Sequence, residues 1–233
     1  MASFASVDAF VRAVKAHPKS KQLNLLICNA GIGGHNATEH SVDGFDVTVQ
    51  SNYLAGERIF HLLLPELTHN RASVVHVTSS MFFLPGPREF IAEFRRHVDA
   101  SSSYGRSKLL QVIGAKIAAR KHPELRVVAA HPGACWSDMT REGPRAWFER
   151  FVPFPVLSFL VPRLAETLFF PASYCAKCVL FGVFSEKLGS GDVTQAFGVM
   201  RPWSFSLPPY PASYFTSDML DTVDAATLMA LPH

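Results

Sequence analysis

Three short, mostly apolar runs, each followed by a polar or glycine-containing turn, most constrain how this sequence folds. They are Leu23–Cys28, Val74–Thr78 and Leu125–Ala130. Strands that are buried on both faces of a parallel sheet read as nearly continuous apolar runs rather than as alternating ones. Helical patterns separate the three runs, and strands that alternate with helices favour a doubly wound parallel sheet with helices on both faces. The sequence therefore predicts a single α/β domain of the Rossmann-like kind.

The spacing of apolar residues predicts the other elements and how they are organised. We expect helices over 3–16, 43–67, 90–98, 104–121, 172–184 and 217–230, and a last strand over 192–199. Asn52 and Gly56 are poor helix formers, so we expect a local irregularity in the second helix. In this scheme the core and site occupy 1–140, an aromatic-rich lid 141–170, the last helix and strand 171–200, and an irregular tail with a possible final helix 201–233.

Composition narrows the class of protein. The 233 residues carry a net charge of +3, and no run of Lys or Arg exceeds two, which disfavours nucleic acid as a partner. No histidine pairs with cysteine at zinc spacing, so no metal site is predicted. The cysteines Cys28, Cys135, Cys175 and Cys178 suit free thiols in the cytoplasm or another reducing compartment, and Cys175-x-x-Cys178 suits helix packing. Neither a signal peptide nor a membrane-spanning run is evident in this sequence.

Tyr104 and Lys108 lie four residues apart at the start of a predicted helix. Residues with this spacing share one face of a helix, so the phenol and the ammonium can point at the same place. A nearby cation favours the phenolate and is expected to lower the pKa of Tyr104. Such a phenol can act as a general acid or base near neutral pH.

The ends of the three predicted strands supply further polar groups. Asn29-Ala30-Gly31, Thr78-Ser79 and His131-Pro132-Gly133 each follow a strand directly. Parallel sheets bind ligands outside the carboxyl ends of their strands. We therefore expect these three segments to meet in one crevice beside Tyr104.

With these residues in place, the protein resembles the short-chain dehydrogenase/reductase family over about residues 3–200, most of all its branch of retinol dehydrogenases and WW-domain oxidoreductases. The motifs that carry the resemblance are, in sequence order, Asn29-Ala30-Gly31, Asp43-Gly44-Phe45, Asn52, Val77-Thr78-Ser79, Tyr104 with Lys108, Pro132-Gly133 and Ser137. Cys28 departs from the family pattern, which has asparagine there.

The resemblance implies an NAD(P)-dependent oxidoreductase that acts on a CH–OH or carbonyl group. Tyr104 is implied as the acid or base, Lys108 as the group that lowers its pKa and holds the cofactor ribose, and Ser79 as the donor to the substrate oxygen. Asn52 is implied to hold a water that links Lys108 to solvent. The cofactor, NADP or NAD, is implied to contact Asn29, Ala30, Gly31, Tyr104, Lys108, Pro132, Gly133 and Ser137. The aromatic lid favours a lipophilic small molecule as substrate.

The resemblance also implies that Met1 falls just after the family's third strand, so the family's glycine-rich cofactor-binding segment is expected to be absent from this sequence. Two hypotheses follow. In the first, the protein is an oxidoreductase whose sequence here lacks that segment. In the second, it is a non-catalytic remnant that pairs its exposed strand 23–28 with a partner or with a second copy, since an unpaired edge strand is a template for pairing. A hydrolase that uses Ser79 and His131 lacks the usual nucleophile motif and is disfavoured.

Overall fold

The structure is a computed structural model, and it describes residues 1–33, 40–79, 82, 104–133, 135, 170–195, 198–199 and 215–232. The predicted helix over 90–98, the lid over 141–170 except Phe170, and nearly all of the irregular tail lie outside these residues. All strands and helices named below belong to the described part of the protein.

A five-stranded sheet in the order β1-β2-β3-β4-β5 forms the centre of the fold. The strands are β1 Leu25–Cys28, β2 Ser73–Val77, β3 Arg126–His131, β4 Val193–Gln195 and β5 Gly198–Val199. The first four run parallel in sequence order, and β5 runs antiparallel to β4. Among the described strands β1 pairs only with β2, so its outer edge is open, as the sequence predicted.

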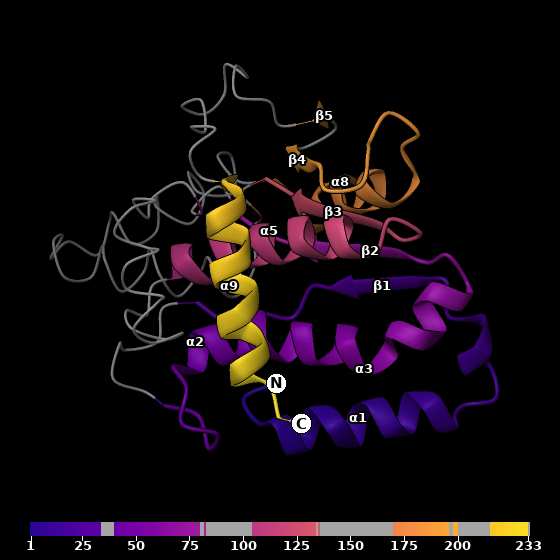
Figure 1. The fold of residues 1–233 in the computed structure, drawn as a ribbon. Helices are drawn as coiled ribbons and strands as arrows, with labels where there is room; N and C mark the ends of the chain where they lie inside the picture. Colours follow the sequence, from indigo (N-terminus) through magenta and orange to yellow (C-terminus); the bar gives the residue numbers. More distant parts are fainter. Residues whose placement is uncertain are drawn as a thin grey trace, which may run out of the picture.

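Helices cover both faces of the sheet (Figure 1). They are α1 Phe4–Ala16, α2 Val47–Val49, α3 Ala55–His69, α5 Tyr104–Lys121, α8 Ala172–Phe184 and α9 Ser217–Ala230, with short helical turns at η1 Ser20–Gln22 and η2 Gln50–Leu54. Side chains of a strand alternate between its faces. Val74 and Val127 therefore pack in the core on the α3 and α5 side, whereas Val75 and Val128 pack with α8. This arrangement confirms the predicted doubly wound α/β fold.

The second predicted helix begins four residues later than expected and is irregular where expected. Asp43 and Gly44 instead form a turn, in which Gly44 has a φ of +86°. Asp46 then caps the helix, because its carboxylate accepts hydrogen bonds from the backbone N–H groups of Thr48 at 3.0 Å and Val49 at 2.9 Å. The π-helical turn η2 follows and contains Asn52, which confirms the irregularity predicted there.

The C-terminal region corrects one prediction and confirms another. The last strand was expected to run unbroken over 192–199, but β4 and β5 pair with each other as antiparallel strands, so the backbone reverses direction between them. The final helix is present as α9, which Thr216 caps through a 3.2 Å bond from Met219 N–H. It crosses over α5, and the two termini lie close together in Figure 1.

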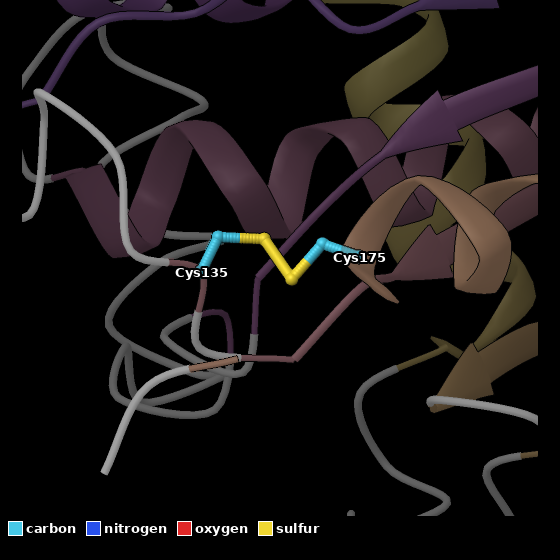
Figure 2. The surroundings of a disulfide bond; sticks show 2 residues. All are labelled: Cys135 and Cys175. Carbon is cyan, nitrogen blue, oxygen red and sulfur yellow. A yellow bond between two sulfur atoms is a disulfide. The ribbon is translucent and has the colours of Figure 1, made fainter. Parts of the chain in front are cut away.

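Two of the four cysteines are joined, contrary to the prediction of free thiols. A disulfide links Cys135, just after β3, to Cys175 in the first turn of α8 (Figure 2). Residues 40 positions apart in sequence are brought together here by the packing of α8 against β3, which no local pattern encodes. Cys175 and Cys178 are both buried, as predicted, and Cys178 keeps a free thiol. Cysteine usage therefore no longer argues for a reducing compartment.

None of the described helices combines enough length and hydropathy to cross a membrane.

Candidate active site

Parallel pairing brings the predicted site segments together at the carboxyl ends of the strands. Cys28 lies opposite His76 in the β1–β2 pair, and Val77 lies opposite Ala130 in the β2–β3 pair. The segments that follow these strands, Asn29-Ala30-Gly31, Thr78-Ser79 and Pro132-Gly133, therefore leave the sheet side by side. Ser137 lies outside the described residues, so its role stays a prediction.

Asn52 joins two of the elements around the site. It is 2% exposed, and its side-chain oxygen accepts from Ile32 N–H at 2.7 Å. Its amide nitrogen donates to Ile32 C=O at 2.9 Å and to Ser107 Oγ at 2.9 Å. The side chain of Asn52 is thus fully engaged in fixing the loop after β1 against the first turn of α5.

Three of the four predicted catalytic residues meet at the start of α5. The phenol of half-buried Tyr104 shares a hydrogen bond with the side chain of Ser79. The Lys108 ammonium lies 5.4 Å from the centre of the Tyr104 ring. Because Thr78 Oγ1 also donates to Lys108 C=O at 2.9 Å, the end of β2 is held directly against the helix that carries both residues.

Lys108 is deeply buried without a carboxylate partner in the described part of the protein. Its ammonium donates to Val77 C=O at 3.0 Å and to Gln111 Oε1 at 2.9 Å, and the residue is 3% exposed. Burial lowers the pKa of Lys108 to about 8, because desolvation disfavours the charged form. At neutral pH the residue is therefore still a cation, but one that is poised near its titration point.

The structure contradicts the prediction of a lowered pKa for Tyr104. Burial raises the pKa of Tyr104, and the hydrogen bond with Ser79 offsets this only in part. Lys108 gives its hydrogen bonds to Val77 and Gln111, and burial is the larger influence on the phenol. In this state of the site, desolvation outweighs the attraction of a cation 5.4 Å from the ring centre.

Gln111 is a member of this cluster that the sequence prediction missed. It is 1% exposed, and its Nε2 donates to the backbone carbonyl oxygen of Asn52 at 2.7 Å. Its position three residues after Lys108 places it one turn further along the same helix face. That spacing was the available signal, but a glutamine on a helix is more often exposed.

The segments around Lys108 are those that the sequence predicted to hold the cofactor. A Cβ at Gly31 would lie 3.1 Å from Asn52 Oδ1 and 3.4 Å from Lys108 Nζ, so glycine lets this loop run close beside the buried ammonium. Asn29 and Ala30 in the same loop are exposed, and Gly133 has a φ of +90°, which favours glycine. Since Lys108 uses two of its three donor hydrogens on described residues, one remains for a ligand hydroxyl.

Solved structures with the same fold include two dinucleotide complexes. The 3-alpha-hydroxysteroid dehydrogenase of Pseudomonas sp. B-0831, solved with NADH, aligns with a TM-score of 0.61 at 18% identity over 82% of this chain and 78% of that one. The L-sorbose reductase of Gluconobacter frateurii, solved with NADPH and L-sorbose, aligns with a TM-score of 0.61 at 15% identity over 85% and 74%. At these identities the likeness shows the fold.

Sequence relatives and a family model identify the protein more closely. A candidate daunorubicin C-13 ketoreductase of Streptomyces is 31% identical over 136 residues, which are 57% of this chain and 46% of that protein. An SDR-family dehydrogenase/reductase, FEY of Arabidopsis thaliana, is 28% identical over 163 residues, which cover 66% of this chain and 43% of that protein. The chain thus spans less than half the length of these relatives. The short chain dehydrogenase family model matches residues 1–146, and the protein belongs to that oxidoreductase family.

Proposed function

We propose that this protein is the catalytic part of an NAD(P)-dependent oxidoreductase that interconverts a carbonyl and an alcohol on a lipophilic small molecule. The observation that carries the proposal is the hydrogen-bonded pair of Ser79 and Tyr104 beside the buried ammonium of Lys108. A bound nicotinamide dinucleotide would supply or accept the hydride. Whether NAD or NADP is used is left open by the described residues.

The residues of the protein would handle the proton and the charge. Tyr104 would donate its phenolic proton to a carbonyl oxygen that is being reduced and would take it back from an alcohol. Ser79, already bonded to the phenol, would donate to the same oxygen as negative charge develops on it. Lys108 lies close enough to stabilise the phenolate left on Tyr104, and its remaining hydrogen would reach the ribose.

The substrate class rests on two supports. The aromatic-rich segment 141–170, which contains Trp147 and Phe148, favours an apolar substrate. The Streptomyces relative carries a ketoreductase name. A closer kinship with the retinol-dehydrogenase branch is part of this proposal and rests on the sequence motifs named above.

The 233-residue protein can be assayed with NADH or NADPH and a panel of lipophilic ketones and aldehydes. Tyr104→Phe should lower kcat by about 100-fold or more, since a positioned general acid contributes on that order. Tyr174→Phe is the matched control, because Tyr174 is also half-buried but lies on α8, where its ring stacks on Phe170. Full activity in Tyr104→Phe would refute the assigned role. Absence of both turnover and dinucleotide binding in the wild-type protein would favour the non-catalytic alternative.

The open edge of β1 supports a second proposal, which concerns partners. Ile27 in the middle of this strand is 37% exposed, and the described strands leave the outer edge of β1 unpaired. Such an edge accepts a strand from another protein molecule. We therefore propose that this edge pairs with a strand of a second copy or of a protein partner.

A further inference from the structure

Gln111 lies one turn beyond Lys108 on α5, and its side chain spans the gap between this helix and the π-helical turn η2. On one side its oxygen accepts from Lys108 Nζ at 2.9 Å, and on the other its nitrogen donates to the Asn52 carbonyl oxygen at 2.7 Å. Both bonds are buried, so neither competes with water.

The orientation of this amide is fixed by its partners. A backbone carbonyl can only accept a hydrogen bond, and an ammonium can only donate one. The Gln111 nitrogen must therefore face Asn52, and its oxygen must face Lys108. A flipped amide would place the NH₂ group against the ammonium and would lose both bonds.

The carbonyl of Asn52 that accepts this bond belongs to η2, the five-residue π-helical turn. In a π-helix the hydrogen-bond ladder is displaced by one residue, which alters the partners of the carbonyls in the turn, and such turns recur at functional sites. Asn52 thus contributes twice. Its side chain holds the loop after β1, and its backbone oxygen holds Gln111.

We propose that Gln111 is a positioning residue that bridges Asn52 to Lys108 and thereby holds the lysine cation in place beside Tyr104. The proposal rests on the function proposed above, in which Lys108 serves Tyr104 and the ribose. Gln111 links Lys108 directly to the backbone oxygen of Asn52, the residue that the resemblance implies to hold a water between Lys108 and solvent. Among the described residues the ammonium faces no charged group, but lies near the Tyr104 ring, the Gly31 backbone and the oxygens of Val77 and Gln111.

Two substitutions at Gln111 are expected to shift the pKa of Lys108 in opposite directions. Gln111→Met keeps the length but removes the acceptor, so the ammonium loses a stabilising hydrogen bond and the pKa of Lys108 should fall by about one unit. Gln111→Glu keeps the acceptor and adds a negative charge at hydrogen-bond distance, so the pKa should rise by about 1–3 units. If Gln111 only filled space, the two substitutions would not shift the pKa of Lys108 in opposite directions.

The direct test is an NMR titration of the Lys108 side chain in the 233-residue protein with isotope-labelled lysine, in which the signal is assigned by its loss in Lys108→Arg. Gln50→Met is the matched control, because Gln50 is equally buried but bonds Asp43 at 3.0 Å and not Lys108. Shifts of opposite sign in the two Gln111 variants, with none in Gln50→Met, support the proposal. An unchanged Lys108 titration in folded Gln111→Met or Gln111→Glu would overturn it.

Kinetics separate this proposal from the proposed function. If the protein is active, the alkaline limb of the kcat profile should move with Lys108, to lower pH in Gln111→Met and to higher pH in Gln111→Glu. A moved Lys108 titration with an unmoved kcat limb would overturn the positioning role. If the wild-type protein shows no turnover, the proposed function fails, whereas the NMR titration still decides whether Gln111 controls Lys108.

Discussion

Glu57 of α3 offers a stability test that can be worked out from the structure. Its side chain is 5% exposed, and its Oε1 has no hydrogen-bond partner within the described part of the protein. Burial, and then the nearby carboxylate of Asp224, raises the pKa of Glu57 to about 8, against which Lys121 acts only in part. Lys121 is already paired with Asp224 at 2.5 Å.

The direction of the pH effect follows from the raised pKa. The unfolded protein has the ordinary value of 4.5, and the folded protein keeps the proton up to about 8. Stability from this group is therefore fully present below pH 4.5, falls as pH rises between these values, and is flat above about pH 8. At 1.36 kcal/mol per pKa unit the full loss is on the order of 5 kcal/mol, and the loss at pH 7 is about 3 kcal/mol.

Glu57→Gln should remove this dependence, because the amide has the shape of the protonated acid and does not titrate. We expect the free energy of unfolding of the variant to rise relative to that of the wild type as pH increases, by on the order of 3 kcal/mol between about pH 5 and pH 8. That is a large share of the roughly 5–15 kcal/mol that stabilises a typical domain. Urea unfolding at several pH values, with unchanged m-values, measures the difference directly.

The control is Glu186→Gln, the same chemical change on an exposed turn residue. Its difference from the wild type should stay nearly constant over the same pH range. Subtracting each variant from the wild type at each pH cancels the titration of other groups, including His61, whose pKa burial lowers. If the Glu57→Gln difference stays within about 0.5 kcal/mol from about pH 5 to pH 8, the reasoning about the buried carboxyl is wrong.

Two further predictions concern the site loop and the open edge. Gly31→Ala places a methyl group 3.1 Å from Asn52 Oδ1 and 3.4 Å from Lys108 Nζ. The affinity for the dinucleotide, measured by fluorescence, should therefore fall by about tenfold or more, where a tenfold change corresponds to about 1.4 kcal/mol. An unchanged Kd would contradict the proposed role of this loop in cofactor binding. Ile27→Lys should reduce the concentration-dependent association that light scattering measures, because a lysine on an edge strand opposes strand pairing. The control is Phe184→Lys on α8, where the replaced apolar side chain is 71% exposed; this change should leave the association unaltered. A wild-type protein that stays monomeric at every concentration would argue against pairing with a second copy.

The elements of the fold could be predicted because their signals are local. The apolar runs at Leu23–Cys28, Val74–Thr78 and Leu125–Ala130 became β1, β2 and β3 with bounds changed by one or two residues. Their order along the sheet follows from parallel pairing of consecutive strands. The poor helix former Asn52 marked an irregular turn because propensity acts at the residue itself, whereas Gly56 lies in the regular helix α3.

The predictions that failed depend on contacts distant in sequence. The Cys135–Cys175 disulfide requires α8 to pack beside the end of β3. The raised pKa of Tyr104 requires knowledge of how deeply its phenol is buried and of where Lys108 donates its hydrogen bonds. Neither can be read from spacing alone, since a Tyr-x-x-x-Lys pattern fixes only which face the two residues share.

Gln111 and Glu57 were missed for a related reason. Polar residues on helices are usually solvated, so their burial becomes visible only when the partner helices are in place. For Gln111 the partner is the backbone of η2, and for Glu57 the surroundings include α9, which lies far along the sequence near the C-terminus.

Gln111 contacts η2, and Glu57 lies in α3, the helix that follows η2. Together, η2 and α3 therefore connect the candidate site to the C-terminal helix α9. Asn52 faces the site through Ser107 and Gln111. Its neighbour Tyr53 faces away and bonds Thr227 of α9 at 2.8 Å. Because consecutive residues of one rigid turn carry both sets of bonds, a change that displaces α9 should move Tyr53 and with it the carbonyl that holds Gln111. Comparison of the Lys108 titration in Thr227→Val and wild-type proteins tests this coupling. A lysine that titrates identically in both would show that the turn isolates the two sides from each other.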